Sequence, residues 1–181
     1  MSKNRFSREL KKRLLRCPGA RPFLCSGHPS DAKIFIVGFN AATPMDEPFS
    51  KFWKAKTGMK LKKFNTFYLS QTKNGKPSPT RRRIDKIAQK AGKKSWLATN
   101  VYWTPTPKET DLPQAQKQES DFVWLMGACN PKKIIAHGKK AQAAVAAWAK
   151  GQRSKKVQLI NCVHLSRITT ADLQAVLAQI P

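Results

Sequence analysis

Short apolar runs recur along the chain, and each is bounded by polar, charged or glycine residues. The clearest run is residues 33–37 (KIFIV), which lies between Asp31 and Gly38 and is rich in branched side chains. Runs of this length and composition are typical of strands buried inside a parallel sheet. The pattern predicts four strands, at residues 33–37, 95–100, 133–137 and 156–163.

Between these runs, apolar residues recur at helical spacing. Phe6, Leu10 and Leu14 predict a basic helix within residues 1–21, ended by Pro18 and Gly19. Three more helices are expected: one that Ser78 or Thr80 caps and that runs to about Ala91, and two at residues 115–128 and 139–150. A last helix is expected from about Thr170 onward. Residues 49–69 mix aromatic residues with lysines, which predicts a segment that is partly helical at best.

Short strands that alternate with helices of about ten to fifteen residues indicate a parallel sheet covered on both faces. We therefore expect an α/β fold, a three-layer α/β/α sandwich with a central, mostly parallel four-stranded sheet. A length of 181 residues fits one domain spanning residues 1–181, in which residues 1–21 form the basic N-terminal helix. The hydrophobic content of 40% excludes wholesale disorder.

The chain is strongly basic, with 35 Lys and Arg against 10 Asp and Glu, a net charge of +25. The partner that best matches such a field is the phosphate backbone of a nucleic acid, and an anionic membrane surface is the weaker alternative. No apolar run reaches the roughly 18 residues of a membrane helix, and the N-terminus lacks the apolar stretch of a signal peptide. We expect DNA as the partner, no membrane association, a cytoplasmic location and a monomeric protein.

Polar residues follow each predicted strand, in residues 38–44, 100–103, 137–138 and 164–167. Ligands bind at the carboxyl ends of the strands in open parallel sheets, because the loops vary there and helix N-termini point inward. We therefore expect these four segments to converge on one edge of the sheet.

These segments resemble motifs of the uracil-DNA glycosylase superfamily. Residues 38–44 (GFNAATP) are similar to the G-x-N-P-G/A motif of its mismatch-specific and single-strand-selective branches, and residues 164–166 (HLS) to its H-P-S motif. Residues 50–54 (SKFWK) and 135–141 (IAHGKKA) are similar to the N-R-F-W-K and L-L-G-K-x-A stretches of the mismatch-specific enzymes. The resemblance covers about residues 22–169. Ala41 and Leu165 stand where the family has proline, which predicts less rigid loops.

The resemblance implies a monofunctional DNA glycosylase that cleaves uracil or a related deaminated base from DNA and leaves an abasic site. The expected catalytic residues are Asn40, whose amide carbonyl holds a water, and His164, which donates a hydrogen bond to the base. Asn100 presents a donor and an acceptor that pair with uracil. The base-binding set is Gly38, Phe39, Phe49 and Asn100, with Phe49 as the stacking platform for a base flipped out of the helix.

Contacts with DNA are expected from residues around the site. Arg167 and Ile168 are expected to enter the space that the base leaves. Phosphate contacts are expected from Ser78, Arg81, Arg82 and Ser166.

Other interpretations of these residues remain open. Asn40 and Asn100 are also residues that stabilise turns, and His164 is also compatible with a structural role. A non-catalytic nucleic-acid-binding protein on the same fold is the main alternative function, and a hydrolase of free nucleosides or nucleotides is a weaker one.

No metal or cofactor is expected. The four cysteines Cys17, Cys25, Cys129 and Cys162 stand singly, without a C-x-x-C pair, and predict reduced thiols. The branch of the superfamily with an iron-sulfur cluster uses a closely spaced N-terminal pair, which Cys17 and Cys25 do not form.

Overall fold

The protein is a mixed α/β structure built on a five-stranded sheet. The structure is a computed structural model, and it describes residues 1–41, 43–93, 95–114, 117, 119–151 and 157–180. The sheet has the order β1-β5-β2-β6-β7. Its strands are β1 (Phe23–Cys25), β2 (Ile34–Asn40), β5 (Trp96–Tyr102), β6 (Lys133–His137) and β7 (Gln158–Cys162). The last four run parallel to one another, as the sequence predicts.

The prediction of four strands is wrong, because β1 adds an antiparallel edge strand beside β5. β1 has only three residues, Phe23, Leu24 and Cys25, which is too short for a periodic pattern to emerge from the sequence. Its register places Phe23 opposite Thr99, whose hydroxyl donates to the carbonyl of Pro22 at 2.6 Å.

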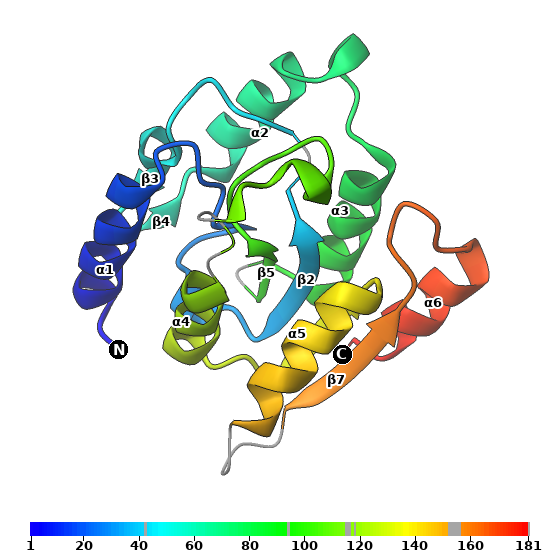
Figure 1. The fold of residues 1–181 in the computed structure, drawn as a ribbon. Helices are drawn as coiled ribbons and strands as arrows, with labels where there is room; N and C mark the ends of the chain where they lie inside the picture. Colours follow the sequence, from blue (N-terminus) through cyan, green and yellow to red (C-terminus); the bar gives the residue numbers. More distant parts are fainter. Residues whose placement is uncertain (42, 94, 115–116, 118, 152–156, 181) are drawn as a thin grey trace.

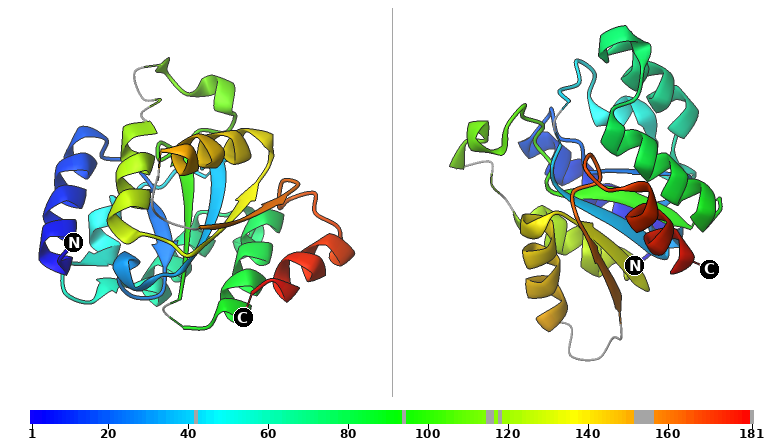
Figure 2. Two further views of the ribbon diagram at one scale, coloured as in Figure 1. Left: turned by 90° about the horizontal axis from the view of Figure 1, so that it is seen from below. Right: turned by 90° about the vertical axis from the view of Figure 1, so that its right-hand side faces the viewer.

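Six α-helices surround the sheet in the part of the chain that the structure describes. They are α1 (Lys3–Arg16), α2 (Leu61–Ser70), α3 (Pro79–Ala91), α4 (Glu119–Cys129), α5 (Lys139–Lys150) and α6 (Thr170–Ala178). Helices α4 and α5 lie on one side of the sheet, and α2, α3 and α6 lie on the other (Figures 1 and 2). The described 3₁₀ turns are η1 (Pro29–Asp31), η2 (Phe49–Phe52), η3 (Lys73–Gly75) and η4 (Glu109–Asp111). A separate two-stranded sheet forms where β3 (Trp53–Lys54) pairs antiparallel with β4 (Gly58–Met59).

Local capping explains where several helices begin. Of the two predicted caps of α3, Ser78 is the one used: its Oγ accepts a hydrogen bond from the amide of Arg81 at 3.2 Å, and Pro79 follows at the first helical position. The hydroxyl of Thr169 caps α6 in the same way, through the amide of Asp172 at 3.1 Å.

Helix α1 lies beyond the β1 edge of the sheet (Figure 1). Phe6 and Leu10 of α1 are fully buried, and the Phe6 ring lies 5.0 Å from the ring of Trp124 on α4. Arg13 forms an ion pair with the buried Asp121 of α4. The predicted basic helix is therefore a packed element, held by an apolar stripe and a partly buried charge pair. No helix among the described residues is both long and apolar enough to cross a membrane.

Candidate functional site

A cavity of about 370 Å³ opens at the carboxyl ends of the parallel strands. Asn40 at the end of β2, Asn100 in β5, His137 at the end of β6 and His164 after β7 all line it. The structure thus brings the three residues to which the sequence assigns the chemistry, Asn40, Asn100 and His164, to one cavity. The size is within the range of small-molecule sites, which begin at about 300 Å³.

Gly38 allows these side chains to approach the backbone of β2. A Cβ atom at this position would lie 2.5 Å from Oδ1 of Asn100 and 2.9 Å from both Cε1 and Nε2 of His137. Such distances are below van der Waals contact, so any larger residue would displace both side chains. Gly38 pairs with Asn100 in the parallel register, which fixes this close approach.

The amide of Asn40 is held in one orientation. Its Nδ2 donates to the carbonyl oxygen of Thr106 at 3.1 Å and to the Thr106 hydroxyl at 2.9 Å. A backbone carbonyl only accepts, so it identifies the amide nitrogen and leaves Oδ1 as the remaining acceptor. This Oδ1 is buried and has no hydrogen-bond partner among the described residues. An orphaned buried carbonyl is unfavourable by itself and is suited to accept from a water or a ligand.

Asn100 differs from Asn40 in that its side-chain amide makes no hydrogen bond to any residue that the structure describes. Its carbonyl and its amino group both remain available at the cavity wall. One planar amide can donate and accept side by side, as recognition of the edge of a base requires.

The hydrogen bonds of His164 identify its tautomer. The backbone amide of Ser166 donates to Nδ1 of His164 at 3.3 Å, so Nδ1 carries the lone pair and the proton of the neutral ring lies on Nε2. The Ser166 hydroxyl lies 2.7 Å from the same nitrogen. Burial lowers the pKa of His164, and the nearby Arg167 lowers it further. At neutral pH the residue is therefore a neutral imidazole with an Nε2–H donor.

His137, which is not among the predicted site residues, also lines the cavity. Its ring packs edge-on against the His164 ring, with centroids 4.9 Å apart. Burial lowers the pKa of His137 to about 3, with a smaller effect from His164. The neutral His137 ring thus packs against His164 and lies next to Gly38, in the space that a side chain at position 38 would occupy.

The loops that carry proline in the resembling family are held here by other contacts. Leu165 is fully buried, and the amide of Arg167 donates to the carbonyl of His164 at 2.8 Å. Ala41 is also buried, and its carbonyl accepts from the amide of Thr106 at 2.9 Å. Burial and backbone hydrogen bonds therefore restrain both loops, although Ala41 and Leu165 stand where that family has proline.

Three of the predicted site residues are placed differently from expectation. Phe49 is 2% exposed and packs on Phe23, with ring centroids 5.1 Å apart, so it supports the cavity wall from behind and offers no stacking surface. Ile168 is also 2% exposed, so its side chain does not project as a wedge. Arg81 is 8% exposed, its Nε donates to Asp85 at 2.8 Å, and it lines the wall of the cavity, so it faces the cavity and not the open surface.

The other predicted residues lie around the opening. Ser78 and Ser166 are exposed and line the cavity, and Arg82 and Arg167 are exposed. Phe39 is only partly buried and is not among the residues that line the cavity; its ring packs against Tyr102 with centroids 5.0 Å apart.

Several residues at the cavity have no counterpart among the sequence predictions. Thr106 orients Asn40, and Arg21 and Tyr68 line the wall. Phe64 and Tyr68 lie four residues apart on α2, a helical spacing that was present in the sequence but hidden among the lysines and aromatics of residues 49–69. No sequence signal marks Arg21, which lines the cavity, or Thr106, which contacts Asn40 from outside the lining, because both act through long-range contacts.

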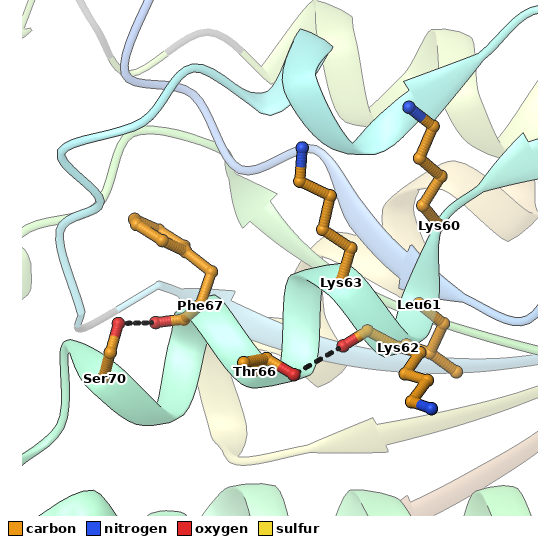
Figure 3. Close-up of a pocket in the computed structure, with 7 residues that line it drawn as sticks. All are labelled: Lys60, Leu61, Lys62, Lys63, Thr66, Phe67 and Ser70. Atoms are coloured by element: carbon orange, nitrogen blue, oxygen red, sulfur yellow. Dashed lines mark hydrogen bonds between the residues drawn. The ribbon is translucent and has the colours of Figure 1, made fainter.

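A second, larger hollow of about 780 Å³ lies along the surface of α2 and contains none of the predicted site residues. Figure 3 shows its seven lining residues, with Lys60 and Lys63 directed away from Lys62. The hydroxyls of Thr66 and Ser70 donate to carbonyls of their own helix, at 3.2 and 2.7 Å. Because no polar groups converge there, the cavity at the strand ends is the candidate site.

Comparison of the chain with protein-family models gives no match, and none of the curated proteins compared with it is similar to it.

Proposed function

We propose that the protein is a three-layer α/β/α DNA glycosylase that hydrolyses the N-glycosidic bond of uracil, or of a related deaminated base, and leaves an abasic site. One observation carries the proposal. Oδ1 of Asn40 and the amide of Asn100, neither of which bonds a described residue, and the Nε2–H of His164 belong to residues of one cavity. An acceptor for water, a base-recognising amide and a neutral donor are the groups that this hydrolysis requires.

In the proposed reaction, Oδ1 of Asn40 accepts a hydrogen bond from a water and directs its oxygen to C1′ of the sugar. The bond between C1′ and the base nitrogen breaks, and both of its electrons leave with the base. The water oxygen then bonds to C1′, and one water proton is lost to the solvent or to the base. An amide is a poor base, so Asn40 contributes positioning, and the reaction proceeds through a sugar with oxocarbenium character.

His164 and Asn100 act on the base. The Nε2–H of His164 donates to a base carbonyl oxygen, where negative charge grows as the bond breaks, and needs no positive charge of its own. Asn100 pairs with the N3–H and O4 of uracil and mismatches the amino group of cytosine. Phe49 lies behind Phe23 and does not line the cavity, so the described aromatic residues that a flipped base would meet there are Phe23, Phe64 and Tyr68.

The net charge of +25 supports DNA as the partner, because a ligand as small as a free nucleoside does not require such a field. The exposed Arg82 and Arg167 and the exposed hydroxyl of Ser78 are available to phosphates. The alternative, a binding protein without catalysis, shares this charge and predicts binding without abasic sites.

The test is to incubate the protein with labelled uracil-containing single strands, U·G duplexes and undamaged controls, and then to cleave abasic sites with alkali. Strand cleavage at uracil alone supports the proposal. Asn40→Ala and His164→Ala are each expected to lower turnover by about 10² to 10³-fold with little change in DNA binding. Asn161→Ala, at an exposed position of β7 outside the cavity, is the matched control and should remain active. Binding to every substrate without abasic sites would refute the enzyme assignment.

A further inference from the structure

Arg21 is a positive charge in the cavity wall, and no carboxylate in the described part of the chain balances it. Its side chain is largely removed from water, and no ion pair joins it to Asp or Glu among the described residues. Its guanidinium donates to the backbone carbonyl of Thr43, which carries no charge. Burial lowers the pKa of Arg21 to about 10, so the group is still cationic at neutral pH. Burying a charge without a counter-charge is unfavourable, which is why such groups commonly serve a ligand.

A second arginine contacts the same aromatic ring as the first. The guanidinium carbons of Arg21 and Arg81 are 5.8 and 5.3 Å from the centroid of the Tyr68 ring, within the range of cation–π contacts. The charge of Arg81 is balanced by Asp85, to which its Nε donates at 2.8 Å, and its Nη2 also donates to the neutral Oδ1 of Asn65 at 2.7 Å. The charge of Arg81 adds a smaller lowering of the pKa of Arg21, as a like charge does.

The remaining residues of the cavity add no negative charge. None of its described lining residues is Asp or Glu, and the histidines 137 and 164 are neutral near pH 7 because burial lowers their pKa values. A ligand in the cavity therefore meets a net positive field in surroundings partly removed from water, where such a field acts most strongly on a developing anion.

We propose that Arg21, Tyr68 and Arg81 form an anion subsite in this cavity, and that the subsite stabilises the negative charge of the departing base. The assignment to the base rests on the proposed function. When the bond to C1′ breaks, its electron pair stays on the base nitrogen and spreads to the ring carbonyl oxygens. Arg21 then acts through its fixed charge: it donates no proton to the base and forms no covalent bond.

The test compares the single-turnover excision of uracil and of 5-fluorouracil from otherwise identical DNA. Fluorine withdraws electrons and makes the base a better anion, so its departure depends less on stabilisation by the protein. In Arg21→Met, excision of uracil should fall by about 10²-fold, and excision of 5-fluorouracil should fall by clearly less. Arg21→Lys should recover much of the lost rate. Arg8→Met, which removes an exposed arginine of α1, is the control and should leave both rates unchanged.

A merely structural role for Arg21 predicts a different result, because misplacing the loop at Thr43 would lower both excision rates by the same factor. Equal losses for the two bases, with no recovery in Arg21→Lys, would therefore overturn the inference. Chemical denaturation of each variant shows whether the fold is retained.

A binding measurement separates this inference from the proposed function. Thermal denaturation is followed with free 5-fluorouracil, below and above the pKa of its N–H group, and with inorganic phosphate. Stabilisation of the wild type that increases as the base ionises, and that Arg21→Met loses, supports the subsite even if no DNA yields abasic sites. Stabilisation by phosphate alone that depends on Arg21 would overturn the assignment to the base. No stabilisation of the wild type by either anion would overturn the subsite itself.

Discussion

Replacing Gly38 with alanine tests whether this glycine is what lets Asn100 and His137 share the cavity wall. The backbone at Gly38 does not have a positive φ, so alanine meets no conformational penalty there. The new Cβ would, however, lie 2.5 Å from Oδ1 of Asn100 and 2.9 Å from two ring atoms of His137. The effect of the substitution is thus purely one of space.

The two neighbours of the new methyl group respond differently. The His137 ring is 4% exposed and enclosed, so moving it resembles overpacking a core and costs about 1–3 kcal/mol. The Asn100 amide moves more easily, since it makes no hydrogen bond to a described residue. That movement costs little free energy of unfolding, but it displaces the amide that we propose recognises the base. A misplacement of about 1 Å can lower a rate by about 10²-fold.

The assays are urea denaturation and single-turnover excision of uracil, with Gly127→Ala as the matched control. Gly127 is exposed in helix α4, and nothing within 4 Å would meet its Cβ. There the same substitution should stabilise the protein by about 0.5–1 kcal/mol and leave excision unchanged. If Gly38→Ala excises uracil at the wild-type rate, the close approach of Asn100 and His137 is not needed for the chemistry and this account of the cavity wall is wrong.

Three further predictions follow from single contacts. Asn40→Asp would place a carboxylate against the Thr106 carbonyl and lose both amide hydrogen bonds. The free energy of unfolding should therefore fall by about 1–3 kcal/mol, and uracil excision should slow. Faster excision would contradict the assigned orientation of the Asn40 amide. His137 has a pKa of about 3 in the folded state, well below its usual value of 6.5. Between these two pH values the unfolded protein binds more protons at this residue than the folded protein does. The stability present above about pH 6.5 is therefore lost as the pH falls toward 3. The denaturation midpoint should therefore drop less between pH 7 and pH 5 in His137→Asn than in the wild type, and equal drops would show that His137 is not the titrating group. Asp121→Asn should lower the free energy of unfolding by about 1–3 kcal/mol. The lower limit is typical of an exposed ion pair and the upper limit of breaking a buried one. A double-mutant cycle with Arg13→Met measures this coupling, and additive losses would mean that the pair does not hold α1.

Much of the fold was predictable because the elements concerned are defined by local patterns. The strand at residues 133–137 and the helix at residues 139–150 have the predicted bounds, since each is an apolar run or stripe ended by a glycine. β1 could not be predicted, because three residues carry no periodicity and the strand depends on pairing with β5. Helix α2 forms from a segment expected to be partly helical at best, because its buried Phe64 and Tyr68 pack on the domain.

In the candidate site too, the features that depend on local sequence patterns were predictable, and those that depend on long-range contacts were not. The rule that ligands bind at the carboxyl ends of parallel strands places Asn40, Asn100 and His164 at one edge, and the structure brings them to one cavity. The same rule does not say which aromatic side chains line the cavity. That is why Phe49, which packs behind Phe23, was assigned a role that its burial does not allow.

The chemistry of the cavity depends on contacts that no local pattern contains. The amide of Asn40 has a donor end and an acceptor end, and which of them remains free is decided by Thr106, 66 residues further along the chain. The backbone of Arg21 is held by a hydrogen bond to the carbonyl of Trp103 at 2.7 Å, which sets the guanidinium at the cavity wall. A sequence motif can therefore indicate that an asparagine stands at a strand end, but the orientation of its amide and the charge facing it are properties of the folded chain. For this reason Thr106 and Arg21, which belong to no recognised motif, are the positions where substitution should best separate a working site from a merely similar sequence.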